Sequence, residues 1–489
     1  MNAPQNPECD LAVIGAGPAG LAAATTAAEC GLQTVLYDEQ AAPGGQIYRA
    51  IENVSRERAA DHALLGEDYQ QGEGLVDAFR ASAATYVPQT SVWEITPDGE
   101  IGILGPEGAR LLSAKRVLIT AGAMERPMPL PGWTLPGVMT AGAAQTLLKA
   151  AGQVPDVPLV LAGSGPLLFL VAWQLVKAGA PVQAILETTP RTNTWRALRY
   201  LPEVWPEAGA LVKGWRWLRE IRRHDVPIMS GVSALRCLGQ DRVEAVAYRI
   251  GMAGEGRLDC GLVLLHQGVV PNHQLAAAAG CDQAWDLRQC CWRTTSDAWG
   301  ATNVAAIAVA GDCVGIGGAL AAEQQGRLAA LDAAHRLGAV SAEERDRRAY
   351  SERRGLARQL GLRRFLDEYF RPAPWLLSPP DDDTVVCRCE EVTAGELRRV
   401  VDMGCPGPNQ AKAFTRAGMG PCQGRMCGQT ISAVIASARG LPLAQVGEAR
   451  VRPPLKPITV GELAEMQGID HEVDLSGGLP AAPKEPAQP

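Results

Sequence analysis

Four cysteines near the C-terminus have the residue type and the spacing to bind a metal or redox centre. Cys387 and Cys389 flank a single arginine, and Cys422 and Cys427 follow in a CxxxxC pattern. A disulfide across a CxC pair is strained, and zinc prefers ligand pairs about two to four residues apart, which only the second pair provides. A [2Fe-2S] cluster needs four thiolates around a larger two-iron core and therefore tolerates unequal spacing. The pattern favours a [2Fe-2S] cluster over a zinc ion or a disulfide pair.

The residues around these cysteines also suit such a cluster. Thiolates and sulfides leave an oxidised cluster with a net negative charge, which nearby basic side chains can offset. The basic residues in position to do so are Arg388, Lys412, Arg416 and Arg425. The glycines of "AGMGPCQGRMCG" let backbone amides approach the sulfurs, which raises the reduction potential. Cys405 has no place in the pattern and is predicted not to be a ligand.

The N-terminal segment has the pattern of a dinucleotide-binding fold. An apolar run at 11–14 suits a buried parallel strand, and glycines follow it in GxGxxG spacing. The first glycine permits a tight turn, the second admits a pyrophosphate, and the third lets the helix pack on the strand. A second apolar run at 34–37 ends in two acids, where a carboxylate should bind an adenosine ribose. The predicted nucleotide contacts are Gly15, Gly17, Pro18, Ala19, Gly20, Asp38 and Glu39.

The strand, turn and helix pattern recurs from residue 159, with Gly163 and Gly165 in place. The third glycine position holds Leu168, which forces the helix away from the strand or opens the turn. Glu187 still ends the next strand where a ribose ligand belongs. The sequence therefore predicts a second dinucleotide-type fold and argues against NAD(P) binding there.

Composition and charge limit the class of protein. A chain of 489 residues is long enough for about two or three domains. The net charge of −7 argues against a nucleic-acid partner. The N-terminus "MNAPQNPECD" has neither a basic nor an apolar signal region, so we expect a cytoplasmic protein with reduced thiols. The most apolar segment, 157–186, is split by a Gly-Ser-Gly-Pro turn and is predicted not to span a membrane.

One basic stretch stands out against this acidic background. Residues 191–225 contain eight Lys and Arg and four of the eleven tryptophans. A helical pair with a solvated basic face is the favoured interpretation. A partner-protein surface is the second, because Trp and Arg anchor interfaces, and RNA binding is a distant third.

Several further motifs resemble the two-dinucleotide flavoprotein reductases of the thioredoxin-reductase-like class. They are "PGGQ" at 43–46, "ITAGAMERP" at 119–127 and "AVAGDCVGIGGALAAEQQGRLAA" from residue 308. The resemblance implies bound FAD, with Gly45 and Gln46 among its contacts and Asp312, after Gly311, binding the ribitol chain. It also implies that the Gly122 loop closes over the isoalloxazine side.

The dithiol of disulfide-reducing members of that class is missing here. Residues 136–270 hold only Cys237 and Cys260, which are too far apart in sequence to form a CxxC motif. Cys290 and Cys291 are predicted to be packed side chains, because a vicinal disulfide distorts the peptide. A dithiol reductase is therefore disfavoured.

The whole pattern predicts an α/β protein with a two-dinucleotide-binding-domain flavoprotein fold and a small, mainly helical C-terminal domain. That last domain resembles the bacterioferritin-associated-ferredoxin-like (BFD-like) [2Fe-2S] domains. The expected boundaries are 1–135 with 270–340 for the FAD domain, 136–269 for the second Rossmann domain, 341–383 for a helical linker, 384–440 for the [2Fe-2S] domain and 441–489 for a tail.

The combination resembles the α subunits of heteromeric FAD-dependent amine dehydrogenases. Three stretches add to the likeness, namely "PGGQIYR", "PGWTLPGVMTAGAAQTLL" and "GSGPLL". This family includes the A component of opine oxidase and the α component of D-hydroxyproline dehydrogenase. The B component of hydrogen cyanide synthase and the α component of sarcosine oxidase are more distant relatives.

The resemblance implies an electron-relaying chain whose amine substrate is oxidised in a partner. The implied partners are a glycine-oxidase-like flavoprotein β subunit, together with a small [2Fe-2S] ferredoxin-like γ subunit. It leaves open an FMN at a subunit interface and a peripheral position at the inner membrane. No catalytic constellation for taking a proton from a substrate is assignable in this chain. Two alternatives remain, a self-sufficient NAD(P)H-dependent reductase and a non-catalytic nucleotide-binding scaffold.

Overall fold

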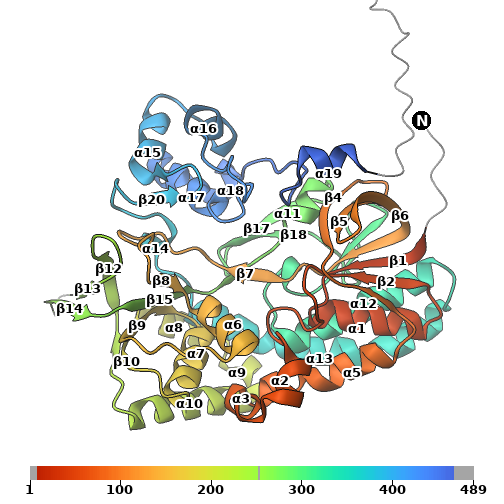
Figure 1. Ribbon diagram of the computed structural model, residues 1–489, viewed down its shortest axis with the longest axis horizontal. Coiled ribbons are helices and arrows are strands. Elements are labelled where there is room, and N and C mark those ends of the chain that lie inside the picture. The colour runs from red at the N-terminus through yellow and green to blue at the C-terminus, as the bar shows by residue number, and fades with distance from the viewer. Residues whose placement is uncertain (1–7, 252–253, 467–489) are drawn as a thin grey trace, which may run out of the picture.

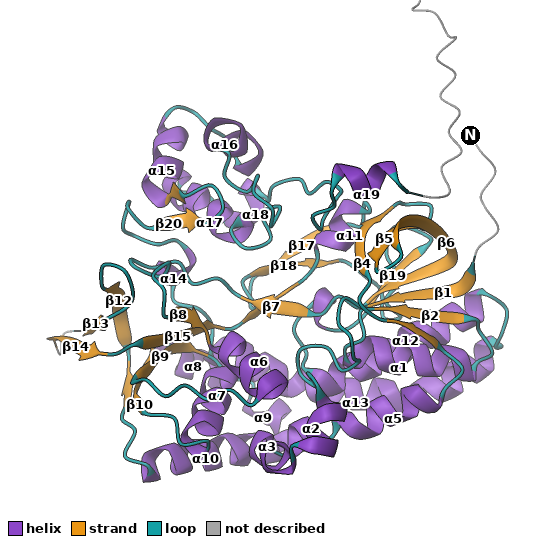
Figure 2. Cartoon of the chain, viewed as in Figure 1, coloured by secondary structure: helices purple, strands orange, loops and turns teal. Residues whose placement is uncertain are grey.

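A computed structural model describes residues 8–251 and 254–466, so the end of the predicted tail, 467–489, lies outside it. Figure 1 shows two α/β domains side by side and a smaller helical domain above them. Figure 2 shows that the two larger domains each place helices against a sheet. The chain starts in the first domain, passes through the second, and returns to the first before it reaches the third.

The first domain is built on a seven-stranded sheet in which β6 is the central partner. The strands along its path are β3 (Thr85–Val87), β2 (Thr34–Tyr37), β1 (Cys9–Ile14), β6 (Gly108–Ile119), β5 (Glu100–Gly105) and β4 (Ser91–Ile95), and β19 (Ile307–Val309) also pairs with β6. The second half of β6 runs parallel to β1 and β19, while its first half pairs antiparallel with β5. The parallel strands are buried and apolar, as strands covered on both faces must be.

Helices cover the sheet of the first domain and complete its core. They are α1 (Pro18–Glu29), α2 (Ile51–Glu57), α3 (Ala59–Leu65), α4 (Glu67–Gln70), α5 (Gly72–Ala81), α11 (Gln274–Ala278) and α12 (Ala319–Arg336). The alanine-rich helices α1 and α12 pack closely together. An added Cβ on Gly326 of α12 would lie only 2.1 Å from the Ala19 carbonyl oxygen of α1. Small side chains at this contact let the two backbones approach.

The second domain repeats the parallel arrangement with five strands. Their order is β11 (Ile228–Ser230), β10 (Val182–Glu187), β9 (Leu159–Ser164), β15 (Leu262–Gln267) and β8 (Val138–Thr140). The accompanying helices are α6 (Ala141–Ala151), α7 (Pro166–Lys177), α8 (Thr192–Leu198), α9 (Leu201–Val204), η1 (Trp205–Glu207) and α10 (Ala208–Arg223). An antiparallel sheet of β12 (Val232–Leu238), β13 (Ala245–Ile250) and β14 (Gly254–Asp259) is added at one side.

Two short antiparallel pairs complete the body of the molecule. β7 (Ala123–Glu125) pairs with β16 (Val269–Pro271) where the chain leaves and re-enters the first domain. β17 (Gln283–Asp286) pairs with β18 (Cys291–Thr294) beside that crossing. In the described part of the chain, no helix is both long enough and apolar enough to cross a bilayer.

The segment expected as a helical linker contains the long helix α13 (Ala342–Tyr369), followed by α14 (Pro374–Leu377). Ser341 caps α13 by accepting a hydrogen bond from the Glu344 amide. The helix is not a free spacer, since it packs against α12 of the first domain and α8 of the second.

The C-terminal domain has its own small core. It contains β20 (Val385–Cys387), β21 (Val392–Thr393), α15 (Ala394–Asp402), α16 (Pro408–Thr415), α17 (Gly428–Arg439) and α18 (Leu443–Val446). Leu397, Ile431 and Val434 are at most 3% exposed in this core. Thr393 and Glu396 form a reciprocal capping box at the start of α15.

After α18 the chain turns back to the first domain. The amide of Leu455, a buried side chain, donates to the Trp93 carbonyl oxygen at 2.8 Å. Lys456 forms an ion pair with Glu39 at 2.5 Å. The last helix, α19 (Val460–Ala464), then lies against β6.

Candidate functional site

The predicted nucleotide contacts of the first domain gather at one edge of its sheet. Ile14 of β1 lies opposite Ile119 of β6, which in turn lies opposite Val309 of β19. The loops that follow these parallel strands hold the Gly15 turn, Gly122 and Gly311. The carboxyl ends of parallel strands are where open α/β sheets bind ligands.

The glycines of the first turn differ in what surrounds them. Gly15 has φ of +105° and Gly20 packs so tightly that an added Cβ would lie 1.8 Å from the Gly15 carbonyl oxygen. A Cβ on Gly45, from the "PGGQ" loop, would lie 2.7 Å from the Gly17 Cα atom. Gly17 itself has nothing within 4 Å of that position. The turn is therefore tight on its protein side and open at its middle glycine, which is the geometry that a pyrophosphate needs.

A helix begins after each of two glycine loops, α1 after the Gly15 turn and α12 after the loop that holds Gly311. Pro18 occupies the first turn of α1, where its missing N–H costs no hydrogen bond. Ala19 is buried, and a Cβ on Gly311 would lie 2.7 Å from its own Cβ. Asp312 accepts hydrogen bonds from the amides of Gly317 at 2.8 Å and Gly318 at 3.1 Å, just before α12. The free amides at both helix N-termini favour an anionic or electron-rich ligand.

The two acids after β2 have separate roles. Asp38 is buried and accepts hydrogen bonds from the amides of Ala16 at 2.5 Å and Gln40 at 2.6 Å. Burial raises the pKa of this carboxyl, and the two amides partly oppose that rise. Glu39 is more exposed and pairs with Lys456. Asp38 thus fixes the glycine turn, whereas Glu39 presents the accessible carboxylate.

Lys149 of α6 holds the "PGGQ" loop from the second domain. Its ammonium group donates to the carbonyl oxygens of Gln46 at 3.3 Å and Ile47 at 2.9 Å, and to the Gln145 side chain at 3.0 Å. Burial, with the nearby Arg49 charge, lowers the pKa of Lys149 to about 7. The side chain of Gln46 is exposed.

The Gly122 loop is fixed from the opposite direction. Gly122 has φ of +65° and its carbonyl oxygen accepts from the Asn272 amide at 2.9 Å. The Asn272 side chain donates to the Ala121 carbonyl oxygen at 2.9 Å. No atom lies within 4 Å of a Cβ placed on Gly122, so this loop also borders open space.

The second glycine turn is covered by protein. Gly163 and Gly165 keep positive φ values of +139° and +127°. A Cβ on Gly165 would lie 3.0 Å from Nε2 of His266, a residue that is 2% exposed. The His266 ring is held by Glu125, whose carboxylate lies 2.6 Å from Nδ1. Leu168, at the third glycine position, is fully buried in the core.

The acid of the second fold is also enclosed. Glu187 is buried and accepts from the Thr189 amide at 3.1 Å, and burial raises the pKa of its carboxyl. Tyr369, at the end of α13, lies near Glu187. Burial, together with the Glu187 charge, raises the pKa of Tyr369. Asn193 of α8 holds this end by donating to the Tyr369 and Arg371 carbonyl oxygens at 3.2 and 2.9 Å.

The four predicted ligand cysteines come together in the C-terminal domain. The Cys427 thiol contacts those of Cys387 and Cys422, and Cys422 contacts Cys389. Hydrogen bonds from Cys427 and from backbone amides lower the pKa of Cys387 to about 6 and that of Cys422 to about 5. The same sharing raises the pKa of Cys427. Cys405 lies in the domain core and donates to the Gly407 carbonyl oxygen instead.

The thiol contacts run in a row from Cys387 through Cys427 and Cys422 to Cys389. Within residues 8–251 and 254–466, no three His, Cys, Asp or Glu side chains are arranged to hold a single metal ion. The Gly418 amide donates to Cys387 Sγ at 3.5 Å, and a Cβ on Gly420 would lie 2.2 Å from the Cys389 Cβ. Four linked thiols, with a backbone amide on one sulfur, are the ligand set that a two-iron core needs.

The basic residues predicted to offset cluster charge take different positions. Arg425 donates to the Cys422 carbonyl oxygen at 3.0 Å, and Arg416 pairs with Glu390 at 2.9 Å. Arg388 lies over the ring of Trp133, 5.2 Å from its centroid, and so faces the body of the molecule. The remaining basic residue, Lys412, lines a pocket described below.

The C-terminal domain is docked on both larger domains by buried groups. Gln429, two residues after Cys427, donates to the Cys290 carbonyl oxygen at 2.6 Å. Buried Arg126 donates to the same oxygen at 2.7 Å. Trp133, which packs in the core of the second domain, donates to the Val385 carbonyl oxygen at 2.7 Å. These contacts place the cysteine loop against the body of the protein.

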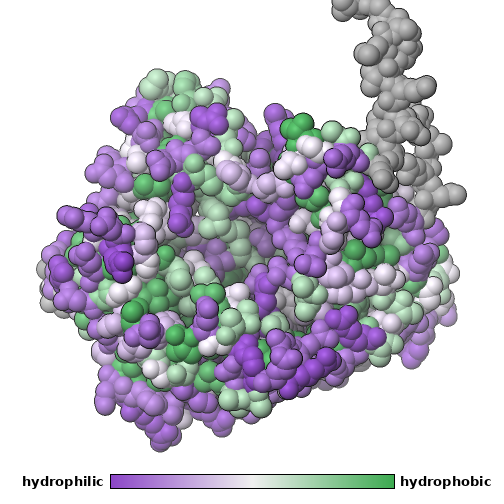
Figure 3. All heavy atoms as spheres, viewed as in Figure 1, coloured by the Kyte–Doolittle hydropathy of each residue, from purple (hydrophilic) through white to green (hydrophobic). Residues whose placement is uncertain are grey.

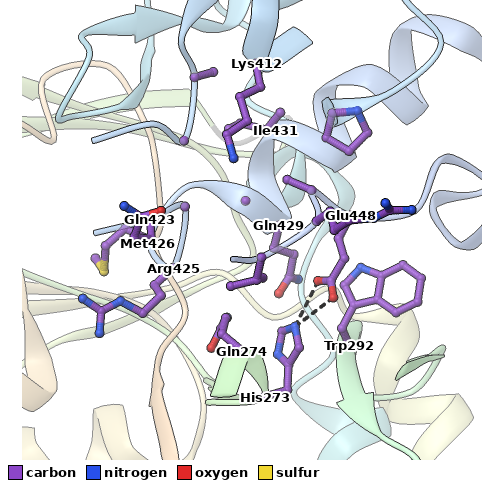
Figure 4. A pocket seen from close by; sticks show the side chains of 18 of the residues that line it. His273, Gln274, Trp292, Lys412, Gln423, Arg425, Met426, Gln429, Ile431 and Glu448 are labelled. Carbon is purple, nitrogen blue, oxygen red and sulfur yellow. Dashed lines mark hydrogen bonds and ion pairs between the residues drawn. The ribbon is translucent and has the colours of Figure 1, made fainter. Parts of the chain in front are cut away.

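A pocket lies where the C-terminal domain meets the first domain. Its polar lining comes from His273, Gln274, Lys412, Gln423, Arg425, Gln429, Glu448, Arg450 and Arg452. Figure 3 shows this face hollowed between the two parts. In Figure 4, Lys412 descends from the C-terminal domain, while His273 and Trp292 rise from the other side. Glu448 lies 3.0 Å from His273 Nε2, and among the described residues it is the one carboxylate in this lining against Lys412, Arg425, Arg450 and Arg452, so the lining has an excess of cations.

Two family models match the chain. The pyridine nucleotide-disulphide oxidoreductase model matches residues 9–326, which is more than half of the chain. The BFD-like [2Fe-2S] binding domain model matches residues 385–437. The A component of opine oxidase from Agrobacterium tumefaciens is 43% identical over 94% of this chain and 92% of its own length. The chain belongs to the pyridine nucleotide-disulphide oxidoreductase family.

Two further proteins are similar to this oxidoreductase over most of the chain. The HcnB component of hydrogen cyanide synthase from Pseudomonas protegens is 30% identical over 91% of this chain and 95% of its own length. The crystal structure of L-proline dehydrogenase from P. horikoshii matches the fold with a TM-score of 0.65 at 19% identity, covering 93% of this chain and 79% of that chain. The predicted fold class and the predicted family resemblance are both confirmed. The chain is an FAD-dependent oxidoreductase subunit with a [2Fe-2S]-type domain.

Several residues that support the site from a distance could not be predicted from the sequence of this oxidoreductase. They are Thr120, Arg126, Lys149, His266, Asn272, His273 and Lys456. Most are single polar residues with no local motif, and their partners lie far away in sequence. Arg126 and Thr120 do sit inside the "ITAGAMERP" motif, which gave the only local signal.

Proposed function

We propose that this chain is the electron-transferring subunit of a heteromeric dehydrogenase that oxidises a secondary amine or an amino acid derivative of the opine or D-hydroxyproline type. One observation carries the proposal. A dinucleotide fold with an open glycine turn is docked, through buried hydrogen bonds, on a domain that brings four cysteine thiols together. A flavin exchanges electrons in pairs or singly, and a [2Fe-2S] cluster exchanges them singly.

The residues of the first domain fit an FAD. Gly17 leaves room for the pyrophosphate, and the α1 N-terminus that starts at Pro18 faces it with free amides. Glu39 offers a carboxylate to the adenosine ribose, with Lys456 orienting it. Asp312 keeps one carboxylate oxygen on the amides of Gly317 and Gly318, just before α12, and offers the other to the ribitol chain. Gly45, Gln46 and Gly122 border the same space.

Cys387, Cys389, Cys422 and Cys427 fit a [2Fe-2S] cluster. Their thiols already lie in contact, and two of them have a lowered pKa that favours the thiolate a metal requires. Cys389 is exposed while Cys387 and Cys427 are buried. A cluster held there would approach the surface on the Cys389 side, where a redox partner can reach it.

The cationic pocket beside the cysteine loop fits the phosphate of an FMN shared with a partner subunit. Lys412, Arg450 and Arg452 supply positive charge, and Trp292 supplies an aromatic ring beside them. Arginine and lysine bind phosphate through charge-assisted hydrogen bonds. The matching test is FMN analysis of the assembled complex, with Arg452→Gln expected to lower the FMN content and to spare FAD.

The substrate site is proposed to lie in a glycine-oxidase-like β subunit, with a small [2Fe-2S] ferredoxin-like protein as a third component. The relatives are named as subunits, which supports assembly with other chains. Glu125, the acid nearest in sequence to the Gly122 loop, already has one carboxylate oxygen on His266 at 2.6 Å and the other on the Gly142 amide at 2.8 Å, which supports placing the base for amine oxidation in the partner. Co-expression with the genes that neighbour this one should yield a complex that reduces an artificial acceptor with an opine or D-hydroxyproline.

The cofactor assignment is tested by analysing flavin, iron and acid-labile sulfide in the purified chain. Cys422→Ser should remove or disturb the cluster signal and leave the FAD spectrum largely intact. Cys405→Ser is the matched control and should keep both. Loss of flavin together with iron in Cys422→Ser would contradict the separation of the two sites.

A self-sufficient NAD(P)H-dependent reductase is the competing function, and the covered second turn speaks against it. His266 lies where a nucleotide would approach Gly165, and Glu187 is buried. NADH should therefore not bleach the flavin of the isolated chain within the time of a stopped-flow mixing experiment. Rapid bleaching would favour the reductase.

A further inference from the structure

Three strongly exposed tryptophans lie on successive helices of the second domain, Trp195 on α8, Trp205 on η1 and Trp215 on α10. Trp195, Trp205 and Trp215 expose 78%, 82% and 55% of their surface. Exposed leucine and valine side chains accompany them, and we call the whole set the tryptophan surface, consisting of Trp195, Leu198, Leu201, Trp205, Leu211, Val212 and Trp215. Single exposed apolar residues are ordinary, whereas a group of this size marks an interaction site.

Helix α10 separates an anchoring face from an outward face. Trp217 packs on Trp173 of α7 at a centroid distance of 6.2 Å, and Ile221 is fully buried. Leu211, Val212 and Trp215 point outward from the first half of the helix. The second half presents exposed arginines on that side, Arg216, Arg219, Arg222 and Arg223. The outward face is therefore apolar at one end and basic at the other.

The basic end carries charge that the protein itself does not neutralise. Residues 191–225 hold eight Lys and Arg against four Asp and Glu, in a chain with a net charge of −7. Among the described residues, Arg216, Arg219 and Arg222 form no ion pair with a carboxylate. Arg219 instead lies over the Trp215 ring at 5.3 Å. An anionic partner surface would complement this arrangement.

We propose that the tryptophan surface docks this protein on an anionic lipid bilayer. Helices that lie in a membrane interface combine Trp and Leu on one face with Lys and Arg beside them. Tryptophan prefers the interface because its ring is apolar and its N–H stays hydrated, and each nearby arginine adds attraction to anionic lipid. Tryptophan and arginine also anchor protein interfaces, so a protein partner is the alternative that the test must separate from a bilayer.

The position of the surface suits this role. In Figure 1, α10 lies at the bottom edge of the molecule and the C-terminal domain lies at the top. Docking through α10 would leave the cysteine loop and the cationic pocket free for protein partners. No membrane-spanning helix occurs among the described residues, so the contact would be peripheral.

Vesicle flotation of the full chain tests the proposal. We expect the protein to float with vesicles of phosphatidylethanolamine and phosphatidylglycerol, and not with phosphatidylcholine alone. Combining Trp195→Gln, Trp205→Gln and Trp215→Gln should lower the bound fraction at least about tenfold. Arg216→Gln, Arg219→Gln and Arg222→Gln should each weaken binding up to about fivefold at low salt, and added salt should mimic them. Brominated lipid should quench the tryptophan fluorescence of the unmodified protein and not that of the triple tryptophan variant.

Matched controls use exposed residues elsewhere. Leu287→Gln and Val460→Gln remove apolar side chains that are 70% and 83% exposed, and both should leave flotation unchanged. Flavin absorbance and far-UV circular dichroism should be unaltered in every variant, which separates this proposal from the cofactor assignment. Absence of flotation in the unmodified protein would overturn the proposal, as would flotation that the tryptophan and arginine variants do not reduce. Loss of a co-purifying protein in those variants, with no vesicle binding by the unmodified protein, would assign the surface to a protein partner.

Discussion

The two dinucleotide folds of this chain share a strand, glycine turn and helix but differ in what lies over the turn. At the first turn, a Cβ on Gly17 would meet nothing within 4 Å, whereas at the second a Cβ on Gly165 would lie 3.0 Å from His266. Gly20 closes the first helix on its strand, and Leu168 stands at the same position in the second. A repeated fold can therefore keep its architecture while only one copy keeps an open nucleotide site.

The largest effect should come from changing the third glycine of the first turn. Gly20→Val places side-chain atoms against the Gly15 carbonyl oxygen, and the backbone there cannot yield cheaply. We expect the FAD content of the purified protein to fall at least about tenfold, measured by absorbance after denaturation. Unchanged flavin in this variant would break the comparison, because it would mean that the first turn does not hold the cofactor.

The equivalent change in the second fold should act on stability alone. Leu168→Ala empties a fully buried position, which should lower the free energy of unfolding by about 2–5 kcal/mol. Urea denaturation monitors this loss. The flavin content per folded molecule should equal that of the unmodified protein, and a parallel loss of flavin would link the second turn to the cofactor.

A third pair of variants compares the acids at the strand ends. Glu39→Gln removes the accessible carboxylate and its ion pair with Lys456, and we expect FAD affinity to fall about tenfold, as for loss of one charged hydrogen bond. Glu187→Gln changes a buried acid of the second fold and should not alter FAD affinity. Reconstitution of the apoprotein with FAD, followed by fluorescence, measures both. An equal loss of FAD affinity in the two variants would show that FAD binding is not confined to the first fold.

The smallest effect concerns Lys149, which joins the two folds. Its pKa is about 7 in the folded protein and the usual value is 10.5, so between these pH values the unfolded chain holds a proton that the folded chain has lost. The free energy of unfolding should therefore rise with pH in this window, by at most about 1.4 kcal/mol per pH unit from this group. Lys149→Met should lack that contribution, so the free energy of unfolding of the unmodified protein minus that of the variant, measured by urea denaturation, should rise with pH across this window. Parallel pH profiles would contradict the lowered pKa.

The sequence was sufficient for features that depend on local pattern. Gly15 and Gly20 predict a turn because only glycine tolerates the close backbone contacts there, and Gly17 leaves the middle of that turn open. Four cysteines in CxC and CxxxxC spacing predict a shared centre. Leu168 indicated locally that the second turn had changed.

Features that depend on distant contacts could not be predicted in this way. His266 covers Gly165 because β15 and β9 are neighbours in the sheet, although the two residues are far apart in the chain. Which of Asp38 and Glu39 stays accessible to a ribose depends on which carboxylate accepts the hydrogen bond of the Ala16 amide. The helix in the expected linker packs against α12 and α8. This packing could not be predicted, because the residue pattern of the linker does not indicate which surfaces the helix will contact.

The return of the chain from the C-terminal domain to the first domain restricts how the redox centres can move. α14 precedes the C-terminal domain, and after that domain Leu455 and Lys456 bind the chain to the first domain again. The C-terminal domain is therefore attached to the body of the protein at both of its ends. A domain attached at one end can rotate and carry its redox centre between partners. Attachment at both ends, together with the hydrogen bonds of Gln429 and Trp133 across the interface, permits little rotation of this domain. Electron tunnelling would then proceed across a fixed gap at a rate set by distance and not by domain diffusion.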